Sequence, residues 1–369
     1  MSHLSHIPLV DLKAQHAEIA DEVAAGFERV FAATAFILGP AVTEFESAYA
    51  SLCGVRHCLG VGNGTDALEM MIRALGLGAG DEVIVPANTF IATALGVLRA
   101  GAKPVIVDSD AFHLLDPAKV EASITPRTHA LLPVHLFGQI ADMEALGEIA
   151  RARDLHLLED AAQSQGAKRN GKRFFGTCAG TSFYPGKNLG AYGDGGAVFT
   201  DDDEIADKLR RLRNWGSDKK YYHPEIGFNS RLDTLQAVVL TAKLKRLEGW
   251  NAARRRAAAR YDALLADVPG IETPRTFPGN EHVWHLYVIR VPERRDEILA
   301  HLNAEGIGAG IHYPTPLHLH GALKDLGYKT GDFPMAEKAA GEILSLPMDP
   351  HITEAQQERV VEVLRRAVA

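Results

Sequence analysis

The chain has 369 residues, of which 46% are hydrophobic and 23% charged, and its formal net charge is -8. This composition is typical of a globular protein with a sizeable core, and the acidic balance speaks against a nucleic-acid-binding surface. Three cysteines that cannot build a disulfide framework, no apolar run long enough to cross a membrane, and an N-terminus without a signal-peptide pattern together predict a cytoplasmic protein.

The N-terminal half begins with helical patterns and then changes to an alternation of strands and helices. Apolar residues at helical spacing predict a helix over 11–31, Gly39-Pro40 interrupts the chain, and a second helix is expected over 41–53. Short strands alternating with helices predict an α/β fold with a mostly parallel sheet covered on both faces. We expect strands at 57–62, 82–86, 104–108, 129–137, 155–160, 180–185 and 195–200, and helices at 65–75, 88–100, 142–153 and from 203.

The C-terminal part has a different texture. Residues 231–267 predict one long helix or a helix pair that ends near Val268-Pro269-Gly270. A smaller α/β unit follows. We therefore expect a large α/β domain with a linking helix over residues 1–250 and a small C-terminal domain over residues 251–369. The small unit is predicted from strands at 285–291, 308–314 and 343–347 and helices at 293–304 and 353–367.

A single lysine stands in the segment SFYPGKNLGAYGDGGA, residues 182–197, among small, glycine-rich and aromatic residues. A solvated surface lysine usually has charged neighbours, whereas Lys187 follows Gly186 and precedes Asn188. A lysine whose charge is disfavoured can act as a nucleophile and condense with an aldehyde. Pyridoxal 5'-phosphate is the cofactor held through such a lysine, and it also needs an acid, phosphate donors and a flat partner for its ring.

The acid for the ring nitrogen is expected at the end of a buried strand, where its charge is not shared with water. The segment LHLLEDAAQSQGA runs from a strand into Glu159 and Asp160 and then turns through small residues. Strand alternation directs one of the two carboxylates inward, and the pattern alone does not decide which. Gln163 follows closely and is a candidate for contact with the polar edge of the ring.

Phosphate donors are expected in the segment VGNGTDALEM, where a glycine-rich turn ending at Gly64 joins a strand to a helix opened by Thr65 and Asp66. A helix N-terminus attracts phosphate through its free N–H groups and its dipole. The alternative is an ordinary strand-to-helix turn that Thr65 caps. Ser182, just before the lysine segment, is a further candidate donor.

The flat partner for the ring is expected at Phe90, in the segment PANTFIATA, which follows a strand and a proline. The alternative is that Phe90 belongs to the core. The glycine turn, the aromatic ring, the strand-end acid and the isolated lysine occur in this order, each at a strand end, where ligands collect in such folds. Their convergence on one ligand predicts a pyridoxal phosphate site.

With these motifs in hand, the chain resembles the sugar aminotransferases of the DegT/DnrJ/EryC1/StrS family, which have the type I aspartate-aminotransferase fold. The resemblance covers nearly the whole chain. It is carried by IPLVDLKAQ, GNGTDALE, PANTFIATA, LLEDAAQSQGA, SFYPGKNLGAYGDGGA, RLRNWGS, GFNSRLDTLQAVVL, HYPTPLH and ILSLPMDP.

The resemblance implies a role for each matching position. Lys187 would form the Schiff base, and Asp160, in preference to Glu159, would pair with the ring nitrogen. Gln163 would contact the ring edge and Phe90 would stack on the ring. The phosphate would lie against Gly64, Thr65, Asp66 and Ser182, with Asn229 reaching it across the interface of a homodimer with a shared active site; Tyr184, Arg231, His312 and Tyr313 would line the nucleotide-sugar pocket.

The resemblance also implies a reaction. Relatives that act as sugar dehydratases replace the lysine by histidine, so Lys187 favours transamination. Members acting at sugar C4 tend to read TTGEGG after the lysine, whereas GAYGDGGA resembles the C3 enzymes. The implied reaction moves an amino group from glutamate to a nucleoside-diphosphate 3-keto-6-deoxyhexose, with dTDP as the expected nucleotide. A C4 aminotransferase acting on a nucleotide-linked 4-keto sugar and a non-catalytic cofactor-binding regulator are the alternatives.

Other site types have little support in the sequence. The sixteen histidines include no HExxH pattern, and Cys53, His57 and Cys58 lack the second pair of ligands that a structural zinc site needs. The glycine spacing at residues 60, 62 and 64 is not the dinucleotide fingerprint GxGxxG. We therefore expect no metal, no nicotinamide cofactor, and neither nucleic acid nor a membrane as partner.

Overall fold

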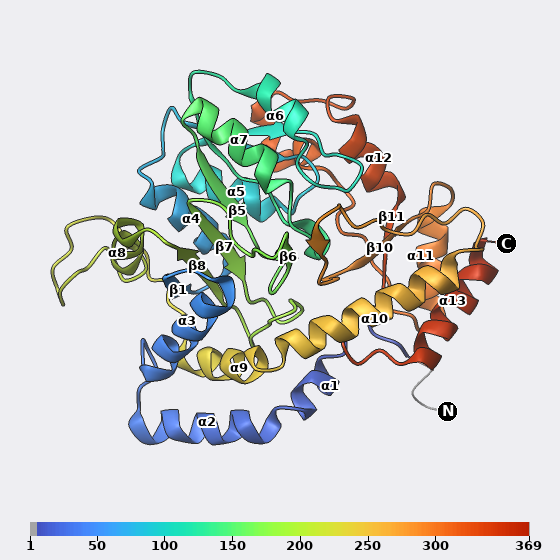
Figure 1. Ribbon diagram of the computed structural model, residues 1–369, viewed down its shortest axis with the longest axis horizontal. Coiled ribbons are helices and arrows are strands. Elements are labelled where there is room, and N and C mark those ends of the chain that lie inside the picture. Colours follow the sequence, from blue (N-terminus) through green and yellow to red (C-terminus); the bar gives the residue numbers. More distant parts are fainter. Residues whose placement is uncertain (1–5, 369) are drawn as a thin grey trace.

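A seven-stranded sheet forms the centre of the larger part of the chain in the computed structural model, which describes residues 6–368 (Figure 1). The strand order is β1-β8-β7-β5-β4-β2-β3. Four neighbouring pairs are parallel and two, β1 with β8 and β7 with β8, are antiparallel, so the prediction of a mostly parallel sheet is confirmed. The strands are β1 (His57–Val61), β2 (Glu82–Pro86), β3 (Lys103–Val107), β4 (Thr128–Leu131), β5 (His156–Asp160), β7 (Cys178–Ser182) and β8 (Gly196–Thr200).

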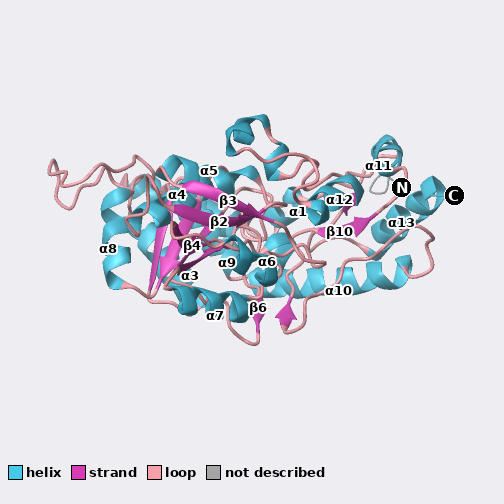
Figure 2. Cartoon of the chain, turned by 90° about the horizontal axis from the view of Figure 1, so that it is seen from above, coloured by secondary structure: helices cyan, strands magenta, loops and turns pink. Residues whose placement is uncertain are grey.

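Helices cover both faces of this sheet (Figure 2), and strand alternation decides which apolar side chain each layer receives. Val83 and Val85 pack with α4 (Gly64–Ala74), α5 (Ile91–Ala100) and α8 (Asp203–Leu212). Ile84, between them, packs on the other face with α6 (Pro117–Ser123) and α7 (Met143–Arg153). Near β7 and β8 that second face is covered by α3 (Pro40–Cys53) and α9 (Thr234–Leu244).

A second, two-stranded antiparallel sheet pairs β10 (Tyr287–Arg290) with β11 (Ile343–Leu346). Its core is shared with α10 (Leu247–Leu265), α11 (Arg295–Ala304) and α13 (Glu354–Val368). The N-terminal segment joins this part: the Ile7 N–H donates to the Gly306 carbonyl at 2.9 Å, and the Gly308 N–H donates to the Ile7 carbonyl at 2.7 Å. The short strands β6 (Lys168–Arg169) and β9 (Asn280–Glu281) pair antiparallel. This pair joins the segment between β5 and β7 to the segment before β10.

The domain boundary expected at residue 250 falls inside α10, and the division into two domains stays a prediction. Segments from each side of this boundary pack in the core of the other part. Ile7 belongs to the core of the second sheet, whereas Leu317 and Phe333 belong to the core of the large sheet. Leu317 lies in one of two short 3₁₀ turns, at Leu317–Leu319 and Gly321–Leu326, and α12 (Pro334–Glu342) follows them.

Several elements differ from the expected ones. The helix expected over 11–31 is divided into α1 (Leu12–Ala17) and α2 (Ala20–Ala33), and α9 and α10 form the expected helix pair. Strand β4 ends early because Pro133 has no N–H to continue the ladder, and a short 3₁₀ turn at Leu136–Gly138 follows. The segment 308–314 forms no extended ladder; Gly310 makes an isolated bridge with Ser345.

Within residues 6–368, none of the helices combines the length and apolarity needed to cross a bilayer.

Candidate active site

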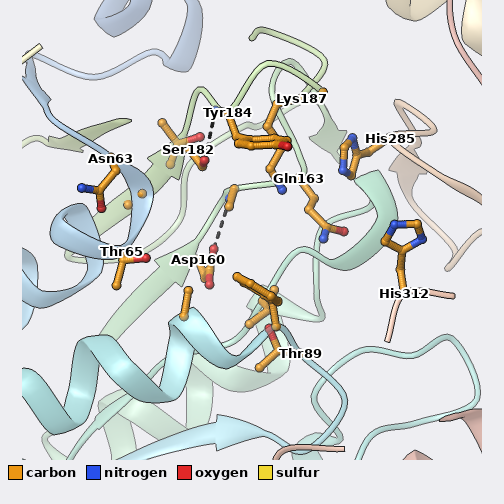
Figure 3. Close-up of a pocket in the computed structure, with 18 of the residues that line it drawn as sticks. Asn63, Thr65, Thr89, Asp160, Gln163, Ser182, Tyr184, Lys187, His285 and His312 are labelled. Carbon is orange, nitrogen blue, oxygen red and sulfur yellow. Dashed lines mark hydrogen bonds between the residues drawn. The ribbon is translucent and has the colours of Figure 1, made fainter. Parts of the chain in front are cut away.

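A cavity of about 430 Å³ opens at the carboxyl ends of β5 and β7, where the large sheet meets the N-terminal segment and the segments before and after β10 (Figure 3). Most of its polar side chains come from the large sheet and its connecting loops. The N-terminal segment adds Leu9 and Val10, and the C-terminal part adds His285, Leu286, His312 and Tyr313. The cavity therefore collects residues that lie far apart in the sequence.

Lys187 enters this cavity from the segment that joins β7 to β8. Its backbone N–H donates to the Tyr184 carbonyl at 2.8 Å, which closes a turn directly before the side chain. A Cβ at Gly190 would lie 2.2 Å from the Pro185 carbonyl oxygen, so this tight turn requires glycine there. Burial lowers the pKa of the Lys187 ammonium to about 8, against the opposing effect of Asp160. The amine is therefore far easier to deprotonate than that of an ordinary lysine.

Asp160, at the end of β5, faces the same cavity and is only 4% exposed. One carboxylate oxygen accepts from the Thr93 hydroxyl at 2.8 Å and the other from the Ala162 N–H at 3.1 Å. Burial raises the pKa of Asp160, although these hydrogen bonds and Lys187 act in the opposite direction. A buried carboxylate so placed would be stabilised by a cationic ring nitrogen.

Glu159, the other candidate acid, points to the opposite side of β5 and is fully enclosed. It accepts hydrogen bonds from the Phe175 N–H at 2.8 Å and the Gly176 N–H at 2.6 Å, and it pairs with His135 Nε2 at 2.8 Å. The carboxylate oxygens of Glu159 are therefore used in hydrogen bonds that stabilise the fold. The alternation that the sequence left open is thus resolved in the structure, with Asp160 in the cavity and Glu159 behind the strand.

Gln163 and Phe90 line the cavity in different ways. The Gln163 carbonyl oxygen accepts from the Phe137 N–H at 2.6 Å, and its amide nitrogen donates to the Tyr313 hydroxyl at 3.0 Å, which orients the amide. Phe90 is 51% exposed, with its ring centroid 5.2 Å from that of Tyr313. Phe90 is therefore no core residue, and its stacking on a bound ring stays a prediction.

The start of α4 opens on the cavity beside Ser182. Its cap is Asn63, whose side-chain oxygen accepts from the Asp66 N–H at 2.8 Å, so the alternative of a turn capped by Thr65 is wrong. Thr65 is then free to line the cavity. A Cβ at Gly64 would lie 2.6 Å from the Ser182 Cβ, so glycine allows the turn and the lysine segment to meet.

Three sequence candidates lie outside the cavity lining. The Asp66 carboxylate accepts from the Ser230 hydroxyl at 2.7 Å and from Arg99 at 3.2 Å. Arg231 donates to the Asn229 side chain and lies over the Trp215 ring, with the guanidinium carbon 4.2 Å from the ring centroid. Within residues 6–368, neither Asn229 nor Arg231 lines the cavity that Lys187 enters. The remaining candidates, Tyr184, His312 and Tyr313, line the cavity.

His285 is a cavity residue that the sequence did not single out for this site. It lies on the wall near Lys187, Gln163 and His312 (Figure 3), and it comes from the segment just before β10. No local motif marks it. The only available signal was a histidine next to an apolar strand, a pattern that is more often part of a core.

The residues present fit a phosphorylated pyridine aldehyde. A buried amine of low pKa, a buried carboxylate, an exposed aromatic ring and a helix N-terminus with a glycine turn face one cavity. The amine suits the aldehyde, the carboxylate suits the ring nitrogen, and the N–H groups suit the phosphate. Fold and site together define a pyridoxal-phosphate-dependent enzyme.

Comparison with known proteins narrows this class. The family model described as the DegT/DnrJ/EryC1/StrS aminotransferase family matches residues 17–365. A dTDP-3-amino-3,4,6-trideoxy-alpha-D-glucose transaminase of Streptomyces venezuelae is 48% identical, over 97% of this chain and 95% of that protein. The erythromycin biosynthesis sensory transduction protein EryC1 of Saccharopolyspora erythraea is 49% identical, over 97% of this chain and 99% of that protein. The chain belongs to the DegT/DnrJ/EryC1/StrS aminotransferase family.

A solved structure agrees with this assignment. The crystal structure of S. venezuelae DesV in complex with a ketimine intermediate superposes with a TM-score of 0.96 and 48% identity, covering 98% of each chain. The predicted fold class and family are confirmed, and the protein is an aminotransferase that uses pyridoxal phosphate.

Proposed function

We propose that this aminotransferase transfers an amino group from glutamate to a nucleoside-diphosphate 3-keto-6-deoxyhexose, with dTDP as the nucleotide, in amino-sugar biosynthesis. The observation that carries the proposal is the placement of Lys187 and Asp160 in one buried cavity, in a chain of this family. The 3-amino sugar in the name of the S. venezuelae relative and the GDGG segment after Lys187 support C3 as the position of reaction.

The residues of the cavity divide the chemistry among them. When bound, pyridoxal phosphate supplies an aldehyde that carries the amino group and a ring that withdraws electrons from a Cα–H bond. Lys187 would hold the aldehyde and, once released as a neutral amine, would take the Cα proton and return it to the aldehyde carbon of the cofactor. Asp160 would keep a proton on the ring nitrogen. The Thr65 and Ser182 hydroxyls and the first N–H groups of α4 would hold the phosphate.

We also propose that the enzyme works as a homodimer with a shared active site. Asn229 and Arg231 lie at the base of an arm, residues 214–227, that projects beside α8 (Figure 1). The arm exposes 81% of Tyr221 and 95% of Ile226, which is a large apolar area for a surface segment. A second copy that covers this arm would bring Asn229 to its partner's cavity.

Mixed dimers test this sharing. Asn229→Ala and Lys187→Ala are each expected to be severely impaired alone. In a mixed dimer of the two, one site carries both defects and the other carries neither, so about half of the wild-type activity should return. The measurement is the activity of dimers purified through two different tags. No recovery in a proven mixed dimer would show that each site is built from one chain.

The substrate assignment is tested by incubating the purified protein with glutamate and candidate dTDP- and UDP-linked keto sugars. We expect consumption of a 3-keto sugar, release of 2-oxoglutarate, and an amine at C3 in the NMR spectrum of the product. An amine at C4 would favour the alternative C4 enzyme. Cofactor binding without turnover of any keto sugar would favour a regulator, the role that the name of the S. erythraea sensory transduction protein suggests for that relative.

The proposed cellular setting is the cytoplasm. All three cysteines are free and buried, which agrees with a reducing environment.

A further inference from the structure

The backbone at His285 is fixed by contacts on two sides. Its backbone carbonyl and that of Trp284 accept from the Arg254 guanidinium, at 3.4 and 3.0 Å, and Arg254 is itself 1% exposed. A Cβ at Gly138 would lie 2.8 Å from the His285 nitrogen, so the chain is confined from this side as well. The roles described above make no use of this histidine.

Two buried amides next to it have unambiguous orientations. The Asn251 side-chain nitrogen donates to the Gln165 carbonyl at 2.9 Å, so the Asn251 side-chain oxygen faces Asn188. The Asn188 nitrogen donates to that oxygen at 2.9 Å and to the Val283 carbonyl at 2.9 Å. Backbone carbonyls can only accept, and they therefore decide both amide orientations.

The orientation of Asn188 decides which nitrogen of His285 carries the proton. With its nitrogen fully used, Asn188 turns its oxygen toward His285 Nδ1, at 3.2 Å. An amide oxygen can only accept, so Nδ1 must donate. Burial and the neighbouring Lys187 and Arg254 charges lower the pKa of His285 well below its usual value, which keeps the ring neutral. Its Nε2 then carries a lone pair, and within residues 6–368 the hydrogen bond found for the His285 side chain is that of Nδ1.

We propose that His285 is a substrate-binding residue, whose Nε2 accepts a hydrogen bond from the sugar hydroxyl next to the reacting carbonyl. The carbonyl carbon must come to the position of Lys187, and His285 lies on the adjoining wall (Figure 3). A hydroxyl on the neighbouring carbon is the donor closest to that point. The inference rests on the proposed function and adds the residue that recognises the acceptor sugar.

The unprotonated Nε2 of His285 can accept a hydrogen bond from the keto sugar but not from glutamate. Beyond its amino group, which reacts, glutamate presents two carboxylates, and these accept hydrogen bonds as an unprotonated Nε2 does. A sugar hydroxyl can donate to Nε2. His285 should therefore contribute to the reaction with the keto sugar and contribute little to the reaction with glutamate, a split that a purely structural residue would not produce.

Two matched variants separate these roles. Asn at position 285 can preserve the contact with Asn188 while removing the cavity acceptor, whereas Gln can place an acceptor oxygen near the position of Nε2. We expect His285→Asn to lower kcat/KM for the keto sugar roughly three- to tenfold. His285→Gln should retain most of the wild-type value, and the reaction with glutamate should stay within about twofold in both variants.

A substrate analogue with hydrogen in place of the hydroxyl next to the carbonyl completes the test. The penalty of His285→Asn should vanish with this analogue, since the donor is gone. An unchanged penalty, an equal loss in both half-reactions, or no loss at all would overturn the inference.

The proton position is measured independently of turnover, by ¹⁵N NMR of the full-length, cofactor-loaded enzyme labelled at histidine. The signals lost in His285→Gln identify this residue. We expect a protonated Nδ1 and an unprotonated Nε2, and a protonated Nε2 would contradict the inference. Failure of the proposed function would look different, because the wild type would react with glutamate and accept no keto sugar while the ¹⁵N signals kept the expected pattern.

Discussion

Replacement of Lys187 by alanine is expected to abolish turnover and the covalent capture of pyridoxal phosphate. Lys187 is the lysine whose side chain lines the cavity, and alanine removes both the amine that bonds to the aldehyde and the group that moves the proton. Turnover is measured by 2-oxoglutarate release, and capture by mass spectrometry after borohydride reduction. An active Lys187→Ala enzyme would refute the assignment of the site.

Lys243 provides a matched control. It is also buried, and burial lowers its pKa to about 8 as well, yet it lies in α9, outside the cavity lining. A low pKa alone therefore does not mark the reactive lysine. Lys243→Ala should still capture the cofactor at position 187. In this variant and in the wild type, the capture rate should rise with pH and level off above about 8, since only the neutral amine attacks.

Asp160→Asn is expected to lower kcat roughly 10²- to 10³-fold while part of the cofactor binding survives. Asparagine preserves the shape of the side chain and can keep the acceptor bond from Thr93, but it loses the negative charge that stabilises a protonated ring nitrogen. Steady-state kinetics and the cofactor content of the purified variant measure the two effects separately. A nearly normal kcat would mean that Asp160 is not the partner of the ring.

Glu159→Gln tests the neighbouring acid in the same way. This change weakens the support given to Phe175, Gly176 and His135, so a lower melting temperature is expected. The rate of the chemical step should fall much less than in Asp160→Asn. A larger loss of kcat in Glu159→Gln than in Asp160→Asn would reverse the two roles.

Much of the fold was predictable because its signals are local. The strand EVIVP is β2 as expected, and the helix expected after the Gly39-Pro40 break is α3, which Gly39 caps and which begins at Pro40. Predictions failed where tertiary contacts decide the conformation. The glycine-flanked segment 308–314 reads as a strand, yet it pairs at Gly310 alone, and the split between α1 and α2 has no glycine or proline to announce it.

The site, like the fold, was predictable from the sequence where the signals are local. Lys187 was recognisable from its unusual neighbours, and family resemblance was needed to choose Asp160 over Glu159 as the partner of the ring nitrogen. Asp160 lines the cavity and Glu159 does not, while the role of Asp160 stays a prediction. His285 was missed because its importance arises from Asn188 and Asn251, which lie far from it in sequence. Such a chain of hydrogen bonds leaves no periodic pattern in the residues that form it.

Glu159 and Asp160 are adjacent on β5 and point to opposite sides of the strand, which limits the mutations that this protein can tolerate. The apolar side chains along the strand can be exchanged for others of similar volume, but its length cannot vary. One inserted or deleted residue before position 159 would rotate the strand end by half a repeat, turning Asp160 toward the Gly176 loop and Glu159 toward Lys187. Viable insertions are therefore expected in the loops that flank β5, and none within it.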